Sequence, residues 1–198
     1  MGLGVSRTVG TNAIPVFQGE AKDIQLAQGG FLLTNPVLPA DTVIPAGTPV
    51  VFNETTRACS ILSWGILHAT AGGSDTDYQV KKGHLFKVGQ YLATGAAGGK
   101  AYAITAIDTT TSSVYDIITV GTTIGAATAG DLMYASTATG ATASAYPSVN
   151  GLLYSDVVSG AGVSVSVVIS GTVYARRTAY NSTLATALSG KITYSQSK

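Results

Sequence analysis

One stretch of this chain indicates its fold: Ile44-Pro45-Ala46-Gly47-Thr48-Pro49-Val50-Val51-Phe52. Proline at position 45 fixes φ near about −65°, and Gly47 supplies the backbone freedom that a tight turn needs. Pro49 has no N–H, which favours the edge or the start of a strand over the centre of a sheet. The stretch has no charged side chain, and similar Gly-then-apolar segments recur downstream. The pattern therefore predicts a β-rich structural protein.

The composition of the surface supports the same interpretation. Apolar residues make up 45% of the 198 residues, enough for a proper core, whereas charged residues make up only 11%. An average soluble protein has roughly 25% charged residues. Thr, Ser, Gly and Ala must therefore cover much of the surface, which suits a protein that packs against its own copies or a larger assembly. The net charge is +1 with no basic patch among aromatic residues, so we expect no nucleic-acid partner.

Transmembrane and secretion signals are not found in the sequence. No stretch approaches the roughly 20 apolar residues of a transmembrane helix, and the first residues lack the apolar run of a signal peptide. We expect no membrane partner. The single cysteine, Cys59, cannot form an intrachain disulfide, and we expect it to be a buried, inert thiol. The lack of cysteine pairs fits a protein assembled in a reducing cytoplasm.

The chain divides into an arm and two β units. Residues 1–30 mix Gly, Asn and Gln around one apolar patch, Ile14-Pro15-Val16-Phe17, and are expected to form an extended N-terminal arm that orders on a partner. Residues 78–146 are predicted to be a second, antiparallel β unit, since turn residues separate its β-branched and aromatic runs. A resemblance of the sequence to a known family implies that residues 31–77 and 147–198 form one β module and that residues 78–146 are an inserted β domain.

The C-terminal region has the most regular pattern. Val163–Ser170 alternates apolar and polar residues, as in a half-buried antiparallel strand. One short helix is predicted at about Ser182–Leu188, with Asn181 or Ser182 as its N-cap and Gly190 past its end. The predicted fold class is mainly β with one short C-terminal helix, and the family resemblance of the sequence implies a small β-barrel or β-tulip-like module plus the inserted β unit.

No group of residues indicates catalysis or metal binding. His68 and His84 fall in different predicted units, and neither has a partner at a metal-ligand spacing. Asp75-Thr76-Asp77 lacks the remaining ligands of a calcium loop. Gly95 to Lys100 is followed by Ala101 and a predicted strand, unlike a phosphate-binding loop. We therefore nominate no catalytic, cofactor or metal residue and expect that the protein is not an enzyme.

Tyrosines are the remaining candidates for a binding role. The chain has ten tyrosines and one tryptophan, and an exposed tyrosine can stack on a sugar or fill a protein interface. Tyr91, Tyr102, Tyr115 and Tyr134 lie in the predicted inserted domain and are candidate glycan or partner contacts. The alternative is that each is a half-buried strand residue.

Two parts of the sequence resemble a known family. Ile44–Val50, followed by Ile66-Leu67-His68-Ala69, looks like the front half of the lambda-type capsid decoration proteins of tailed phages. Val167–Val173, the short Leu/Ala helix and Ile192-Thr193-Tyr194 resemble the C-terminal pattern of that family. The chain is also similar to phage head-fibre proteins, in which a decoration module carries an added domain, here residues 78–146.

The resemblance implies a structural protein of the virion. It would trimerise on the outer surface of an expanded capsid and clamp subunits of the major capsid protein, with no catalytic residues and no cofactor. Its arm would contact the capsid through Ile14, Pro15, Val16 and Phe17, by adding a strand to a capsid sheet. The alternative function is a head-fibre adhesion module that binds host or mucosal glycans through the four tyrosines.

Overall fold

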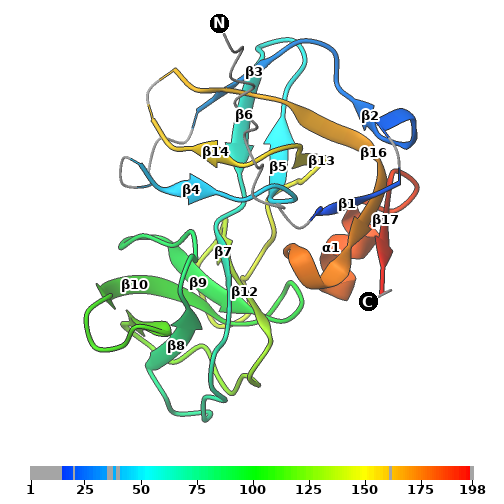
Figure 1. Cartoon of the computed structure of the whole chain (residues 1–198). Helices are drawn as coiled ribbons and strands as arrows, with labels where there is room; N and C mark the ends of the chain where they lie inside the picture. Colours follow the sequence, from blue (N-terminus) through cyan, green and yellow to red (C-terminus); the bar gives the residue numbers. More distant parts are fainter. Residues whose placement is uncertain (1–14, 20, 35–37, 39–40, 161, 197–198) are drawn as a thin grey trace, which may run out of the picture.

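The computed structural model of the protein describes residues 15–19, 21–34, 38, 41–160 and 162–196. The described chain is mainly β, with one short α-helix near the C-terminus, as predicted. A nine-stranded sheet curls into a half-barrel, and a six-stranded sheet lies beside it with the helix at their junction (Figure 1). In the described part, no helix is both long and apolar enough to cross a membrane.

The nine-stranded sheet is assembled from distant parts of the chain. Its main path runs β1-β16-β13-β5-β6-β3-β15, and β2 and β17 also pair with β16. Most pairs are antiparallel, but β3–β6 and β16–β17 are parallel. The strands are β1 (Phe17–Gln18), β2 (Gln25–Leu26), β3 (Phe31–Leu33), β5 (Pro49–Phe52), β6 (Ala58–Ile61), β13 (Gly151–Leu153), β15 (Ser164–Val165), β16 (Val167–Tyr174) and β17 (Ile192–Ser195).

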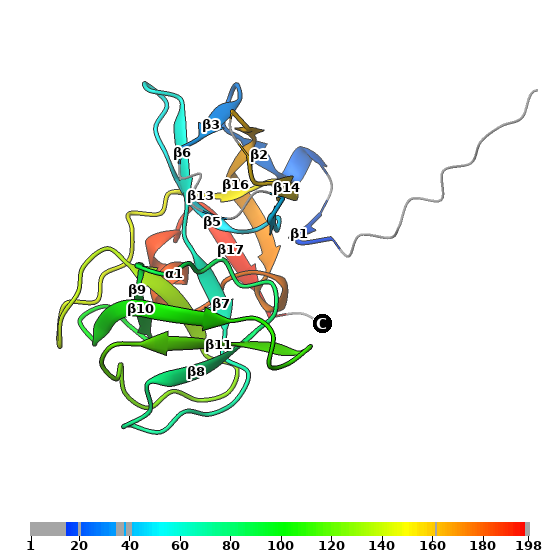
Figure 2. The same cartoon turned by 90° about the vertical axis from the view of Figure 1, so that its left-hand side faces the viewer.

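The six-stranded sheet, in contrast, comes from one continuous part of the chain, and Figure 2 shows several of its strands below the nine-stranded sheet. Its order is β7-β12-β9-β10-β11-β8, with every pair antiparallel. A bridge between Leu67 and Val80 joins the ends of this order, and the His68 N–H donates to the Gln79 carbonyl at 2.7 Å. We call this ring, residues 64–136, the barrel. Its strands are β7 (Trp64–Ile66), β8 (Asp77–Lys81), β9 (Tyr91–Thr94), β10 (Ala101–Asp108), β11 (Tyr115–Val120) and β12 (Leu132–Ser136).

A two-stranded ribbon and three short helices complete the described chain. A two-stranded ribbon pairs β4 (Val43–Ile44) with β14 (Val157–Val158), and two single-turn 3₁₀ helices, η1 and η2, span Ala21–Asp23 and Ala175–Arg177. The helix α1 (Ser182–Ala187) begins as predicted, because the Asn181 side chain accepts a hydrogen bond from the Leu184 N–H at 2.9 Å. Gly190 follows its end with φ at +80°.

The turn at residues 44–50 has the predicted geometry. Gly47 has φ at +78°, a region that favours glycine. The Thr48 hydroxyl donates to the Pro45 carbonyl at 2.8 Å, which closes the turn. Pro49 is the first residue of β5, one of the two positions that its missing N–H favours. The Trp64 indole N–H donates to the Thr48 hydroxyl at 3.3 Å, so the turn also contacts the first strand of the barrel.

The domain boundaries differ from the predicted ones. The six-stranded sheet begins at Trp64, upstream of residue 78, because β7 pairs with β12. Residues 17–18 and 25–26 are strands on β16 and not part of an extended arm. Their neighbours Val16 and Ile24 are apolar and pack against the core. Burying these side chains is more favourable in free energy than leaving them exposed to water. Residues 1–14 of the predicted arm lie outside the described residues.

The two sheets share one hydrophobic cluster, which we call the shared core. Ala93, Leu132 and Tyr134 of the barrel pack with Leu152 of β13 and Leu184 of α1. The barrel interior and the nine-stranded sheet have separate clusters in addition. Because burial in the shared core involves both sheets, we expect neither sheet to be stable without the other.

Cys59 lies in the cluster of the nine-stranded sheet. Its side chain is fully buried, and this burial raises the pKa of the thiol to about 11. A thiol with a pKa this high is protonated at neutral pH, and the thiolate is the reactive form. The prediction of a buried thiol is therefore confirmed, and its raised pKa agrees with the expectation that it is inert.

Candidate functional site

The candidate capsid-contact segment lies against the protein's own sheet. The Pro15 carbonyl accepts a hydrogen bond from Arg177 Nη1 at 2.6 Å, and the Val16 carbonyl accepts one from the Tyr174 N–H at 3.0 Å. Phe17 pairs with Val173 in β16. We call Pro15–Gln18 the anchor segment. Ile14, the fourth candidate, lies outside the described residues.

Side chains also contact the anchor segment or the residues that bind it. The Phe17 ring stacks on Tyr154 with the ring centres 6.0 Å apart. The Arg177 guanidinium lies 4.6 Å from the centre of the Tyr174 ring, in the geometry of a cation–π contact. In this position Val16 and Phe17 fix the segment to β16, and β1 is the end strand of the sheet path.

The turn at residues 44–50 also packs against the anchor segment. A β-carbon added to Gly47 would lie 2.7 Å from Val16 Cγ1 and 2.9 Å from Thr178 Oγ1. The Thr178 hydroxyl donates to the Gly47 carbonyl, and the Ala46 N–H donates to Asp156 Oδ1 at 2.8 Å. Parts of the chain near residues 16, 47 and 178 therefore converge here, a convergence that no local sequence pattern indicates.

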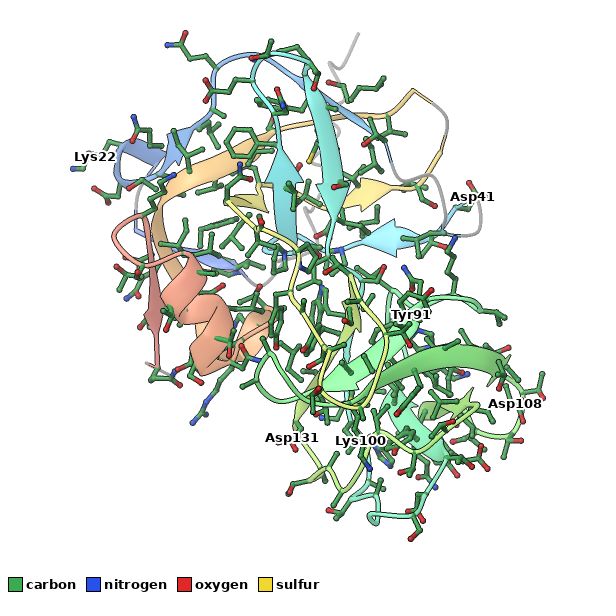
Figure 3. The ribbon with its side chains drawn as sticks, turned by 180° about the vertical axis from the view of Figure 1, so that it is seen from behind. Lys22, Asp41, Tyr91, Lys100, Asp108 and Asp131 are labelled. Carbon is green, nitrogen blue, oxygen red and sulfur yellow. The ribbon has the colours of Figure 1, made fainter. Side chains whose placement is uncertain are left out.

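The four candidate tyrosines do not form one surface. Tyr91, shown at the start of β9 in Figure 3, packs partly against the shared core, and Tyr102 packs against the barrel interior on the opposite face of the sheet. Tyr115 stacks on His68 with the ring centres 5.1 Å apart. The glycan alternative therefore lacks a common binding face among these residues.

Tyr134 cannot contact a ligand in this structure. Its side chain is fully buried in the shared core and stacks on Tyr146 with the ring centres 3.7 Å apart. Burial also raises the pKa of its hydroxyl. Its assignment as a glycan or partner contact is corrected on this ground, because a sugar needs an exposed ring face for stacking.

A cluster that the sequence did not predict lies on the barrel, formed by Lys82, His84 and Asp116. Lys82 Nζ donates to Asp116 Oδ1 and to the Thr109 carbonyl, the latter at 2.7 Å. His84 Nε2 lies 3.2 Å from Asp116 Oδ2, and the side chains of His84 and Asp116 are 7% and 6% exposed. The pairing of β11 with β8 brings together residues that are distant in sequence.

The hydrogen bonds of His84 define its protonation state. Its Nδ1 accepts a hydrogen bond from the Phe86 N–H at 3.1 Å, so the proton of the neutral ring is on Nε2, facing Asp116. Burial lowers the pKa of His84 and nearby Lys82 lowers it further, against the opposing effect of Asp116. The cluster is therefore an ion pair of Lys82 and Asp116 beside a neutral imidazole.

The cluster does not offer a recognisable metal site. Within the part of the chain that the structure describes, no group of three or more His, Cys, Asp or Glu side chains could hold a metal ion. His84 and Asp116 form only a pair, and Lys82 already occupies one carboxylate oxygen.

Comparison with known proteins gives no match: no family model fits the chain, and no curated protein or solved structure is significantly similar to it. Any functional assignment therefore rests on the residues and the geometry described above.

Proposed function

We propose that this chain is a structural virion protein that binds the outer surface of a phage capsid as a trimer and stabilises or decorates the head. The observation that carries the proposal is the anchor segment, a short strand added to β16 directly after residues 1–14. The anchor segment fixes to the fold the point at which residues 1–14 join it, and those residues are the proposed contact with a partner. The proposed capsid contact is the arm, with Ile14, Pro15, Val16 and Phe17 at its end, and residues 1–14 are the part that can be removed without the anchor segment.

The surface of the described chain is consistent with protein contacts. Val43 and Val158 face each other across the ribbon and are 55% and 50% exposed. Only 11% of all residues are charged, so contacts with other subunits require little desolvation of charge. In a trimer bound at a symmetric site, three weak contacts act together, and the effective concentration of each arm raises the affinity of the whole.

Removal of residues 1–14 tests the arm. The chain that begins at Pro15 keeps the anchor segment, and we expect it to fold normally but to lose at least about tenfold in occupancy on expanded capsids. Capsid sedimentation with quantified bound protein measures the loss. A chain in which Gly and Ser replace residues 1–14 at equal length is expected to lose the same amount, and Lys100→Gln, at an exposed position, to lose nothing.

Two results would contradict the proposal. Full occupancy by the shortened chain would exclude residues 1–14 as the capsid contact. A single protomer mass at micromolar concentration, by light scattering or mass photometry, both alone and after release from capsids, would exclude the trimer. The test requires the head proteins of the phage that encodes this chain, and the major capsid protein is the proposed partner.

A further inference from the structure

Lys82 and Asp116 meet on the barrel because their strands are neighbours. β8 and β11 are antiparallel with Val80 opposite Asp116, and the Lys82 N–H donates to the Val114 carbonyl at 3.2 Å. Lys82 therefore stands diagonally across from Asp116 on the same face of the sheet, a spacing of roughly 7–8 Å that a long side chain can bridge. The lysine does bridge it, because its Nζ contacts Asp116 Oδ1 directly.

The carboxylate in this pair is buried at one end of the barrel interior. The Asp116 side chain is 6% exposed and lies on the same face as Val80 and Ile118, which belong to the interior cluster. Both of its oxygens have partners, as burial of a charge requires: Lys82 Nζ at Oδ1, and His84 Nε2 at 3.2 Å from Oδ2. Little water can reach this carbon, which favours condensation there over hydrolysis.

The amine is held in place by a second acceptor. Nζ of Lys82 also donates to the Thr109 carbonyl at 2.7 Å, so two of its three protons have fixed acceptors. Asp108, which Figure 3 shows at the end of β10, uses both oxygens to accept hydrogen bonds from the loop that follows it. Asp116 is therefore the carboxylate toward which the amine is directed.

We propose that Lys82 and Asp116 condense into an intramolecular amide bond, an isopeptide cross-link between the end of β8 and β11. Reacting groups held in contact behave as if each were present at about 10⁵–10⁸ M, which favours a bond that free amines and acids form poorly in water. With a single cysteine, the chain has no disulfide that could supply such a link. The cross-link is independent of the capsid-binding proposal, since both residues lie in the barrel.

The step is a condensation that needs no oxidant and no cofactor. One proton moves from the Lys82 ammonium to Asp116 Oδ1, which leaves a neutral amine and a neutral acid. The Nζ lone pair attacks Cγ, and negative charge develops on Oδ2, where the His84 Nε2–H stabilises it. A second proton passes from Nζ to Oδ1, the Cγ–Oδ1 bond breaks and water leaves. The Lys82 side chain is 35% exposed, so the released water has a path to solvent.

Mass spectrometry of the purified full chain tests the bond directly. Under denaturing conditions, the intact mass should be lower than the mass of the sequence by one water molecule. Trypsin cleaves after lysine and arginine but not after an acylated lysine. Digestion should therefore release residues 82–87 joined to residues 101–176 as one branched peptide.

Variants identify the reacting groups. Lys82→Arg keeps the positive charge but has no nucleophilic amine, so it should show the full mass of its sequence. Lys81→Arg, at the exposed neighbouring position, is the matched control and should still lose one water. His84→Ala removes the donor at Oδ2 and should slow cross-linking about 100-fold, followed as the cross-linked fraction after a pulse of synthesis. His84→Gln, whose amide N–H can replace the ring donor, should recover part of the rate.

Several outcomes would overturn the assignment. A folded wild-type chain that keeps the full mass of its sequence after a day of incubation would show that the pair does not condense. A water loss that persists in folded Lys82→Arg would place the bond at other residues, and its absence from folded Lys81→Arg would contradict the assignment to Lys82. Equal rates in the wild type and His84→Ala would exclude His84 from the mechanism.

Discussion

The barrel and the nine-stranded sheet both bury apolar side chains, but they are built from the chain in opposite ways. All barrel strands come from residues 64–136, and neighbouring strands are antiparallel. The nine-stranded sheet instead joins strands that span residues 17–195 and includes two parallel pairs. Non-local pairing costs more loop-closure entropy before any contact forms. The barrel therefore has the simpler folding route, and the sheet depends on late contacts between its ends.

The shared core links these two regions into one structure. If it is essential to both, damage in it should unfold the barrel together with the sheet. If the barrel is self-sufficient, it should survive such damage. The predictions below test this difference, from the largest expected effect to the smallest.

Tyr134→Ala removes a fully buried ring from the shared core and should destabilise the protein by about 3–5 kcal/mol. We expect a single unfolding transition in urea, with coincident curves from the fluorescence of Trp64 and from far-UV circular dichroism. Tyr115→Ala, at a half-exposed barrel position, is the control and should cost about 1 kcal/mol. A separate unfolding transition of the barrel in Tyr134→Ala would mean that the barrel is stable without the nine-stranded sheet.

Gly47→Ala should destabilise the sheet side by about 2–3 kcal/mol. The new methyl group would overlap atoms of Val16 and Thr178. This steric overlap adds to the strain of a positive φ at a residue other than glycine. Gly130→Ala in the barrel has a similar φ of +96° but no atom within 4 Å, so it should cost only about 1 kcal/mol. Urea midpoints of the two variants measure the difference. Equal losses of stability in the two variants would show that the close approach of Val16 and Thr178 to Gly47 adds no cost.

Acid should weaken the barrel through His84. The pKa of His84 in the folded protein is lowered from the ordinary value of 6.5, so the unfolded chain binds a proton more readily. Stability should therefore be complete above about pH 6.5 and should fall as the pH drops below it toward the folded pKa. Protonation of Nδ1 also removes the acceptor of the Phe86 N–H.

Thermal midpoints between about pH 7.5 and pH 5 measure this effect. His84→Gln should flatten the curve in this window relative to the wild type. His68→Gln, at a half-exposed histidine stacked on Tyr115, is the matched control and should keep the slope. The same slope in all three proteins would exclude His84 as its source.

The smallest effect is expected at the anchor segment. Arg177→Gln removes the hydrogen bond to the Pro15 carbonyl and the contact with Tyr174, at a cost of about 1 kcal/mol. Faster amide exchange of the Tyr174 N–H, which donates to the Val16 carbonyl, should report the loosened strand. Arg176→Gln at the neighbouring exposed position should leave that exchange rate unchanged.

Local chemistry made several features predictable from the sequence. The Asn181 cap, the turn at Gly47 and the position of Pro49 each depend on residues within a few positions of one another. The burial of Cys59 follows from the general preference of cysteine for the interior. The β-rich class and the short C-terminal helix followed from such signals together.

Features that depend on tertiary contacts were missed. Tyr134 was a candidate surface residue, but β12 lies between two cores, with Met133 in the barrel interior and Tyr134 in the shared core. The usual alternation of buried and exposed residues therefore does not apply there. The two-residue strands β1 and β2 are too short for a pattern, and the meeting of His84 with Asp116 depends on the pairing of β8 with β11.

The pairing around Val173 has a practical consequence for engineering. Val173 pairs with Phe17 of β1 and also with Tyr194 of β17. Two inter-strand spacings of about 4.8 Å place Phe17 and Tyr194 about 10 Å apart. A linker of a few residues should therefore join Ser195 to Pro15 in a circular permutant. New ends in the exposed hairpin between β10 and β11 would then present fused cargo from the barrel.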